Sequence, residues 1–477
     1  MTARPSTVEL GSAPISRFRP LLGDGAWGEL EQTMLELATA VRGRVVWNIN
    51  STARGGGVAE LLSSLIPYDR DAGVDERWLV IEGSQPFFDI TKRIHNLLHG
   101  VPSNGSEITA GERHEYERTI ARNAKALVDV VRRRDVVILH DPQAAGLVPP
   151  LLEHGAHVIW RSHVGVDKPN HESRAAWDVL RRYLTGAAAL VFSRRSYVWE
   201  GLDPARVHII PPTIDPFSVK NEDLDEEAVT GILAAAGILE GSAESATFKR
   251  VDGALGRIER RATLDGSTLP RNALVTTQVS RWDRLKDPLG VLEAFAQHVA
   301  SRSESRLILA GPSAESVRDD PEQPEVLGQV IARREQLKPA VRDRVQIAQL
   351  PMGDVDENAF IVNALQRRSD VIVQKSLAEG FGLTVAEAMW KARPIVASRV
   401  GGIEDQIEDG KSGLLIDDPA DLEAVGDGIV RLLADRSVAS SLGIEARRRA
   451  TSHFIAPRHL EQQARLILGV IDRDGAT

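Results

Sequence analysis

The sequence predicts two α/β domains, each built on a mostly parallel, doubly wound sheet. Three observations predict this fold class. Short apolar runs rich in β-branched residues alternate with helical patterns, which is the rhythm of a parallel sheet covered by helices. That rhythm stops at a proline-rich segment and then starts again. Finally, 477 residues suffice for two ordinary domains, which usually contain roughly 100–200 residues each.

The first domain is expected to span residues 1–215. Its strands are predicted by the runs VVWNIN, WLVIEG, DVVILHD, HVIWRS, ALVFS and VHIIPP. The segment IIPPTIDPF then contains three prolines in six residues, and proline supplies no backbone donor to a helix or a sheet. We therefore expect the interdomain hinge near Pro211 to Pro216.

The second domain is expected to span residues 216–455. Its strands are predicted by the runs NALVTTQVS, RLILAG, RVQIAQL, DVIVQKS, PIVASRV and GLLI, and the run DLEAVGDGIVRLLAD has a helical pattern. A charged, helix-prone stretch opens this domain and no clear strand follows it, so we expect a helical insertion at about 222–270. Residues 456–477 are predicted to form a C-terminal helix that could pack on either domain.

Composition excludes several classes of function. A formal net charge of −9, with both signs mixed, argues against an extended nucleic-acid surface and favours small-molecule substrates. There is no cysteine, so neither a disulfide nor a thiol nucleophile can exist, which suits a cytoplasmic protein. The N-terminus lacks the apolar core of a signal peptide, and we expect no membrane span because no run approaches about 18 apolar residues.

A pair of glutamates marks the first candidate site. Glu379 follows the strand-like run DVIVQKS, and Glu387 lies about one turn into a helix that is expected to begin at Leu383 or Thr384. Between them, Gly380 and Gly382 flank Phe381 and permit close backbone approach, while the amides of the helix start can bind an anion. Two carboxylates around an anion site fit a sugar nucleotide, although an arbitrary pair of glutamates is more often solvated.

Two cations follow another predicted strand. Arg281 and Lys286 occur in SRWDRLKDP, between the run ALVTTQVS and a helical pattern. Since ligands bind open α/β sheets at the carboxyl ends of strands, these cations can reach the same edge as the glutamates. There they can neutralise a diphosphate and stabilise it as a leaving group.

The first domain offers weaker signals. Gly55, Gly56 and Gly57 form a strand-to-helix turn that can approach phosphate or sugar, although three glycines also make an ordinary tight turn. Arg161 and His163 follow a buried-looking strand. A lone histidine is usually structural, and His140 in LHDPQ is an example of one that carries no information by itself.

Metal ligation is not expected. The acidic run DVD at Asp354 to Asp356 suggests a metal ligand set at first sight, but its sequence setting is that of an ordinary polar loop. Arg281, Lys286 and the helix N-termini can supply the positive charge that paired aspartates with a metal provide in other sugar-nucleotide enzymes.

The motifs GGGVAELL, RSHVG, SRWDRLKDP and SLAEGFGLTVAEAMWKARPIVASRVGGIEDQI resemble those of retaining GT-B glycosyltransferases. Among these, the chain is most similar to glycosyltransferring trehalose synthases and the related trehalose phosphorylases, over most of Val45 to Ile416. The resemblance implies two Rossmann-like domains that face a central cleft, an N-terminal acceptor domain and a C-terminal donor domain.

The resemblance also implies roles for the candidate residues. Glu379 is expected to hold the transferred glucose and Glu387 the nucleotide ribose. Arg281 and Lys286 are expected to bind the diphosphate, and His163 the donor sugar. The remaining residues with implied roles are Gly380, Phe381, Gly382, Leu383 and Thr384 at the donor, and Gly55, Gly56, Gly57 and Arg161 in an acceptor or phosphate loop.

The implied reaction makes α,α-trehalose from a nucleoside diphosphate glucose and glucose, with retention. ADP-, UDP- or GDP-glucose is the expected co-substrate, no cofactor is required, and Mg²⁺ is at most a stimulant. A homodimer is compatible with these expectations. Three alternatives stay open: a trehalose phosphorylase, a retaining glycosyltransferase with another acceptor, and a non-catalytic nucleotide-sugar sensor.

Overall fold

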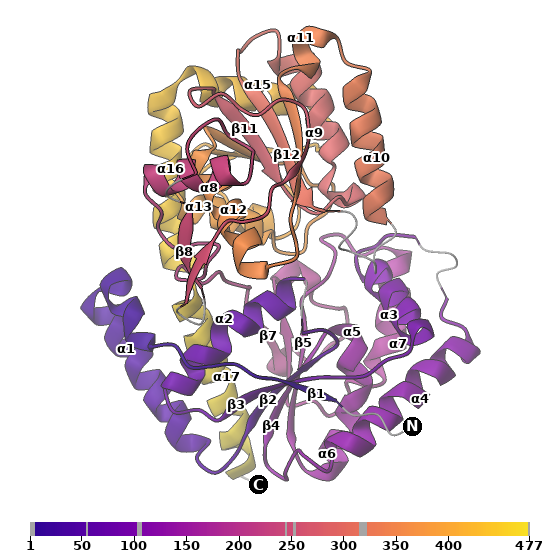
Figure 1. Ribbon diagram of the computed structural model, residues 1–477. Helices are drawn as coiled ribbons and strands as arrows, with labels where there is room; N and C mark the ends of the chain where they lie inside the picture. Colours follow the sequence, from indigo (N-terminus) through magenta and orange to yellow (C-terminus); the bar gives the residue numbers. More distant parts are fainter. Residues whose placement is uncertain are drawn as a thin grey trace. The chain divides into compact units, whose positions relative to one another are not determined.

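The computed structural model describes residues 5–53, 56–102, 107–243, 246–250, 254–313 and 322–475. The chain divides into two compact units (Figure 1). Unit 1 comprises Met1–Ile214 and Ile455–Thr477, and unit 2 comprises Asp215–Phe454. The chain thus leaves unit 1 within the proline-rich segment predicted as the hinge, and its last helix belongs to unit 1.

Unit 1 is built on a seven-stranded sheet in the order β1-β3-β2-β4-β5-β6-β7. Its neighbouring strands are parallel except for β1, which pairs antiparallel with β3. The strands are β1 Ser6–Val8, β2 Val46–Asn50, β3 Glu76–Val80, β4 Val136–His140, β5 His157–Ser162, β6 Ala189–Phe192 and β7 Val207–Ile209. All six strands predicted for this domain are confirmed.

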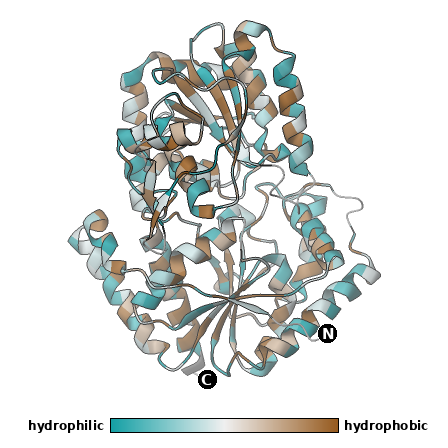
Figure 2. Ribbon diagram, viewed as in Figure 1, coloured by the Kyte–Doolittle hydropathy of each residue, from teal (hydrophilic) through white to brown (hydrophobic). Residues whose placement is uncertain are grey.

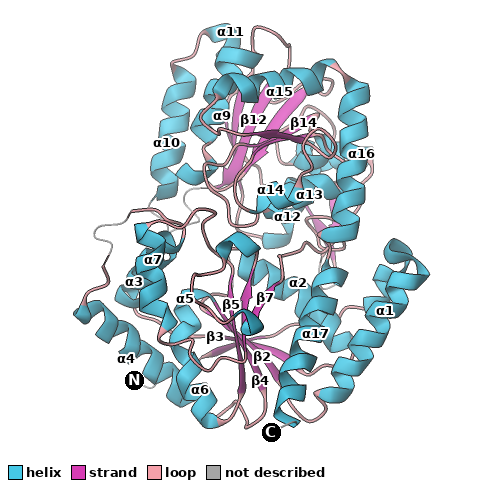
Figure 3. Ribbon diagram, turned by 180° about the vertical axis from the view of Figure 1, so that it is seen from behind, coloured by secondary structure: helices cyan, strands magenta, loops and turns pink. Residues whose placement is uncertain are grey.

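Helices cover both faces of this sheet (Figure 3). Trp47 and Ile49 of β2 pack into a core with helices α3, α4 and α7, whereas Trp78 of β3 packs with α2 on the opposite face. The helices are α1 Arg19–Ala40, α2 Gly57–Asp71, α3 Gln85–Leu98, α4 Ala110–Leu127, α5 Asp141–Ala144, α6 Val148–His154, α7 His171–Arg181 and α17 Ala456–Gly475, with 3-10 turns η1 Ile15–Phe18, η2 Ala145–Leu147, η3 Arg195–Tyr197 and η4 Pro204–Arg206. Helix α17 packs against α1 and α2, which answers where the C-terminal helix lies.

Unit 2 repeats this plan with the strand order β10-β13-β12-β11-β14-β15-β16. Only β10 is antiparallel to its neighbour, β13. The strands are β10 Thr263–Asp265, β11 Val275–Val279, β12 Arg306–Pro312, β13 Val345–Leu350, β14 Val371–Gln374, β15 Ile395–Ser398 and β16 Leu414–Ile416. The six strands predicted for this domain are therefore confirmed as well.

The strands of unit 2 are rich in apolar residues, as the brown ribbon segments in Figure 2 show, and alternation along each strand divides their side chains between two faces. Leu307 and Leu309 of β12 pack with helices α9, α10 and α15, whereas Ile308 and Ala310 pack with α8 and α12. The helices are α8 Glu226–Ala235, α9 Pro288–Ala294, α10 Glu322–Glu335, α11 Pro339–Arg342, α12 Val355–Arg368, α13 Leu383–Trp390, α14 Gly402–Gln406, α15 Leu422–Ala434 and α16 Arg436–His453, with the 3-10 turn η5 Arg284–Lys286 and the π-helical turn η6 Phe295–Val299.

The predicted helical insertion at 222–270 is wrong in part. Helix α8 occupies only its first section. Strands β8 Thr247–Lys249 and β9 Leu255–Arg257 then pair antiparallel, and β10 extends the main sheet. These strands have three residues each and no apolar run, so they depend on tertiary pairing that local sequence pattern does not report.

Two helix glycines allow a matched test of packing in unit 2. A Cβ atom on Gly443 in α16 would lie 2.3 Å from the carbonyl oxygen of Ala392, whereas a Cβ on Gly328 in α10 would meet nothing within 4 Å. We expect Gly443→Ala to lower the free energy of unfolding by about 1–3 kcal/mol through overpacking. Gly328→Ala should instead raise it by about 0.5–1 kcal/mol through helix propensity. Urea unfolding measures both, and equal shifts in the same direction would contradict this packing.

Candidate active site

The carboxyl ends of β11 and β14 bring the first candidate residues together. The two strands are parallel neighbours, so the segments that follow them meet at one edge of the sheet. Lys286 ends the 3-10 turn after β11, and Glu379 lies in the loop after β14. The ammonium of Lys286 forms an ion pair with Oε2 of Glu379, whose side chain is only 9% exposed.

A series of hydrogen bonds holds Glu379 from its other side. The Thr384 hydroxyl donates to Oε1 of Gln374 at 3.2 Å, and Nε2 of Gln374 donates to Oγ of Ser376 at 3.0 Å. Ser376 in turn donates to Oε2 of Glu379 at 3.2 Å. Because Gln374 and Ser376 are buried, they fix the carboxylate between a cation and a hydroxyl. Sequence analysis missed both residues, whose signal is a polar pair at the end of an apolar strand.

The start of helix α13 supplies backbone donors beside this carboxylate. Gly382 precedes the helix with φ +87°, a conformation that favours glycine, and a Cβ there would lie 3.0 Å from Cγ1 of Ile403. The amide of Gly402 donates to the carbonyl of Gly380 at 3.1 Å, which fixes the loop. First-turn amides have no partner inside a helix and attract anions. The helix begins at Leu383, as predicted.

Glu387 lies inside α13 and is 1% exposed. Lys220 Nζ lies 3.3 Å from its Oε1, and Nε2 of Gln366 donates to its Oε2 at 3.1 Å. A buried carboxylate requires such partners because desolvation of the charge is costly. Neither Lys220 nor Gln366 was recognised in the sequence.

The second predicted cation, Arg281, lies in a more exposed environment than Lys286. Its side chain is 53% exposed and its guanidinium donates to Asp283 at 3.1 Å. A further cation that sequence analysis missed, Lys375, is 2% exposed and forms an ion pair with Asp287. The carboxylate of Asp287 also accepts from the amide of Gly290 at 3.0 Å, so Lys375 is part of the local framework at this sheet edge.

The glycine turn of unit 1 is described only in part. Gly56 precedes α2 with φ +86° and no side-chain cap, and Gly57 is the first helical residue. Gly55 lies outside the described residues. The expected strand-loop-helix arrangement from β2 to α2 is present around them.

Arg161 lies within β5 and not after it, which corrects the predicted loop position. The side chain is 2% exposed and its guanidinium donates to Nε2 of His459 at 2.8 Å and to the carbonyl of Ile210 at 3.0 Å. These partners belong to unit 1 and anchor α17 and the segment after β7 on β5.

His163 follows the last residue of β5 and is half-buried. Its amide donates to Oδ1 of Asp141 at 2.7 Å, and its Nε2 lies 3.0 Å from Nδ1 of His140. The two imidazole rings are nearly stacked, with centroids 5.2 Å apart. His140 is thus a direct neighbour of the predicted site residue and not an uninformative histidine.

Burial and charge shift the pKa values of this group. Burial, together with the nearby Arg161 charge, lowers the pKa of His140 to about 3 and that of His163 well below its usual range. Burial raises the pKa of Asp141 to about 7 and lowers that of Arg161 to about 9. Both histidines are therefore neutral at pH 7.

The acidic run at Asp354 begins a helix and is not an ordinary polar loop. Asp354 caps α12, where its carboxylate accepts from the amides of Asp356 and Glu357 at 3.1 Å each, and it pairs with Arg250 at 2.7 Å. Within the described ranges, no group of three or more His, Asp or Glu side chains has the arrangement of a metal site.

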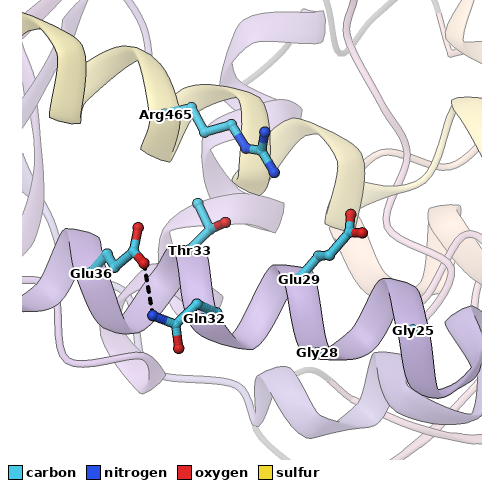
Figure 4. A pocket seen from close by; sticks show the side chains of 7 residues that line it. All are labelled: Gly25, Gly28, Glu29, Gln32, Thr33, Glu36 and Arg465. Atoms are coloured by element: carbon cyan, nitrogen blue, oxygen red, sulfur yellow. Dashed lines mark hydrogen bonds between the residues drawn. The ribbon is translucent and has the colours of Figure 1, made fainter.

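A shallow hollow is present in unit 1. Figure 4 shows the residues of α1 and α17 that line it. Its volume is about 680 Å³. Its lining includes Gln32, which donates to Glu36 at 2.7 Å, and Arg465, which pairs with Glu461. None of the predicted site residues lines this hollow.

The fold of the chain is also found in solved structures of other proteins. It matches an α,α-trehalose-phosphate synthase (UDP-forming) from Burkholderia vietnamiensis with a TM-score of 0.64 and 13% identity, covering 90% of this chain and 98% of that chain. Such structural neighbours are GT-B glycosyltransferases, with two Rossmann-like units of the kind described above. The predicted GT-B fold is confirmed.

Sequence comparison defines the family within this class. Residues 48–199 match the family described as "Trehalose synthase, N-terminal domain", and residues 260–449 match "Glycosyl transferases group 1". A trehalose synthase from Rubrobacter xylanophilus is 35% identical over 97% of this chain and 99% of its own length. The chain therefore belongs to the trehalose synthase family and is a hexosyltransferase of carbohydrate metabolism.

Trehalose phosphorylases are more distant relatives. The enzyme from Grifola frondosa is 24% identical over 91% of this chain, but the match spans only 58% of that enzyme. Separately, no helix in the described part of the chain combines the length and apolar character that a membrane span requires.

We expect the buried Asp141 to make stability fall as pH rises. The pKa of Asp141 is about 7 in the folded protein and about 3.9 in the unfolded chain. At a pH between these two values, the folded protein therefore binds more protons than the unfolded chain does. The stabilisation is complete below about pH 4 and is lost as pH rises towards 7. Asp141→Asn should remove this loss of stability at higher pH, because asparagine does not titrate. The asparagine side-chain oxygen can still accept from the amide of His163, and asparagine tolerates the backbone φ of 62° at this position.

Urea unfolding of both proteins at pH 5 and pH 7.5 measures this effect. The variant should gain stability relative to the parent at the higher pH. Asp24→Asn is the control, since the Asp24 side chain is 95% exposed. If the difference in free energy of unfolding between the parent and Asp141→Asn is the same at both pH values, the expectation is contradicted.

Proposed function

We propose that this chain is a retaining glucosyltransferase that makes α,α-trehalose from a nucleoside diphosphate glucose and free glucose. The observation that carries the proposal is the Lys286–Glu379 ion pair beside the start of α13. A cation, a fixed carboxylate and helix amides at one sheet edge are the groups that a sugar diphosphate requires. The 35% sequence identity to the trehalose synthase from Rubrobacter xylanophilus supports the choice of product.

We assign the donor to unit 2. Lys286, helped by Arg281 and the amides near Leu383, would stabilise the diphosphate as negative charge grows on it. Glu379 would accept hydrogen bonds from hydroxyls of the transferred glucose. The Ser376 hydrogen bond and the Lys286 ion pair already hold this carboxylate in place, so little reorganisation would be needed when the donor binds.

Glu387 would accept hydrogen bonds from the nucleotide ribose. Its burial is compatible with this role only if a ligand hydroxyl joins or replaces the present partners Lys220 and Gln366. In unit 1, we assign His163 to the donor sugar and the glycine turn at Gly56 and Gly57 to donor and acceptor.

The chemistry follows from these assignments. The bond between the glucose anomeric carbon and the phosphate oxygen breaks, and a bond to the anomeric oxygen of the acceptor glucose forms on the same face. The departing phosphate oxygen takes the acceptor proton, so the products are trehalose and a nucleoside diphosphate. No protein nucleophile is required, and the protein acts by alignment and by stabilisation of the leaving group.

Proton NMR tests the proposal directly. The protein is incubated with glucose and ADP-glucose, UDP-glucose or GDP-glucose in separate tubes. The single anomeric signal of the symmetric product, together with released nucleotide, is expected in at least one tube and also identifies the donor. Nucleotide release without trehalose would indicate another acceptor or hydrolysis, and turnover only of trehalose with phosphate would indicate a phosphorylase.

Lys286→Ala should lower kcat by about 30- to 1,000-fold, because loss of a cation aimed at the leaving group costs roughly 2–4 kcal/mol of transition-state stabilisation. Arg284→Ala is the matched control, since Arg284 lies on the same 3-10 turn but is 58% exposed and pairs with Glu325. It should leave kcat within about twofold of the parent, within the range of surface substitutions. Steady-state kinetics with a normal kcat for Lys286→Ala would remove Lys286 from the site.

Glu387→Gln should weaken nucleotide-sugar binding more than it affects a donor without nucleotide, such as α-glucosyl fluoride. The substitution keeps the size of the side chain and its contact with Gln366 but removes the charge that a ribose diol would contact. We expect KM for the nucleotide sugar to rise about tenfold, corresponding to roughly 1.4 kcal/mol for one charged hydrogen bond. Equal losses with both donors would refute the ribose assignment.

A further inference from the structure

We propose that His140 is a positioning residue that fixes the tautomer of His163, through a directional series of hydrogen bonds running from Glu76 across the unit 1 sheet. The series makes His163 a hydrogen-bond acceptor at Nδ1. This inference deepens the proposed function, because it specifies how His163 meets a substrate hydroxyl.

The series follows the strand order of the sheet. Glu76 lies on β3, Asn48 on β2, His140 on β4, and His163 directly after β5. These four strands are consecutive neighbours in the sheet. Each step therefore joins side chains that neighbouring strands, or the residue directly after a strand, bring close together.

The direction of the series starts at Glu76, which accepts a hydrogen bond from the buried Asp69, because burial raises the pKa of Asp69 well above its usual range and Asp69 therefore holds the proton of this pair. Nδ2 of Asn48 donates to Oε1 of Glu76 at 2.5 Å, so the amide oxygen of Asn48 is turned towards β4. This Oδ1 lies 2.9 Å from Nε2 of His140. A carbonyl oxygen can only accept, so Nε2 of His140 must carry a proton.

The second half of the series sets the direction of the hydrogen bond between His140 and His163. A neutral imidazole with a proton on Nε2 has an unprotonated Nδ1, which can only accept. Nδ1 of His140 lies 3.0 Å from Nε2 of His163, so the proton of this contact belongs to His163. His163 is left with a lone pair on Nδ1, for which the described residues provide no hydrogen-bond partner.

The charges around the two rings keep them neutral. His140 is 2% exposed and Asn48 is fully buried. Burial, together with the nearby Arg161, His140 and His459, holds the pKa of His163 well below its usual range. Asp141 contacts the amide of His163 and not its ring.

The proposal has a consequence for substrate recognition. A neutral imidazole with a free Nδ1 accepts a hydrogen bond from a hydroxyl but cannot donate one to a phosphate oxygen through that atom. The group that meets Nδ1 of His163 must therefore carry a proton, as a sugar hydroxyl does. The opposite tautomer would present an N–H and would favour the phosphate.

The matched variants are His140→Phe and His140→Asn. Phenylalanine keeps a planar ring but removes the acceptor for His163, whereas the Oδ1 of asparagine can take the position of Nδ1. Asn48→Leu removes the first acceptor without changing either histidine. His114→Phe replaces an exposed histidine of α4 and serves as the control.

Nitrogen NMR of the protein labelled with ¹⁵N-histidine reads the tautomer directly, with His163 assigned by its loss in His163→Gln. We expect the parent, His140→Asn and His114→Phe to show His163 with a proton on Nε2 alone. His140→Phe and Asn48→Leu should show a mixture of tautomers. An Nδ1-protonated or charged His163 in the parent, or an unchanged single tautomer in folded His140→Phe, would overturn the proposal.

Kinetics supply a second readout. His140→Phe should lower kcat/KM about tenfold, the effect expected for one misplaced hydrogen bond, and His140→Asn should recover most of that loss. Equal losses in both variants would indicate a purely structural role and overturn the proposal. The NMR result does not depend on turnover, so a protein that makes no trehalose but has the expected tautomer would refute the proposed function and leave this inference standing.

Discussion

The ion pair between Lys286 and Glu379 is the interaction on which the candidate donor site depends. Both groups are largely withdrawn from water, and a buried charge without a partner costs several kcal/mol. The pairing of β11 with β14 brings the two residues to one sheet edge, although they are far apart in the chain. The register of these strands therefore determines whether the site exists, and Ser376 then fixes which way the carboxylate faces.

In unit 1, a network of hydrogen bonds stabilises buried polar side chains of the central sheet. Polar side chains on β3, β2 and β4 lie within an otherwise apolar sheet and are satisfied by one another. In a low dielectric such a network is stable only when each donor meets an acceptor, so its members are strongly coupled. The two units thus share a fold but bury polar groups differently, through an ion pair at the sheet edge in unit 2 and through a series of hydrogen bonds that begins at Glu76 in unit 1.

The sequence predicted the strands well because each is an apolar, β-branched run that a parallel sheet buries on both faces. It failed at β8, β9 and β10, which are short and polar and depend on pairing partners. The meeting of Glu379 and Lys286 at one sheet edge, and the position of Glu387 in the helix that follows, could be predicted from motif and strand position. Gln374, Ser376 and His140 could not, because their roles come from neighbours brought close by folding. A polar residue inside a buried apolar strand, as in VVWNIN or DVIVQKS, is the local signal that was available.

The return of the chain to unit 1 has a consequence for biosynthesis. Arg161 and Glu76 are made early, yet their partners His459 and Gln463 lie on α17, which follows the whole of Asp215–Phe454. At roughly 5–20 residues per second, a ribosome needs about 10–50 s to translate that intervening unit. Throughout this interval the nascent first unit lacks the helix that covers a buried arginine and a buried glutamate. Unit 2 can complete its own core first, so the domain whose synthesis begins second is the first that can finish folding.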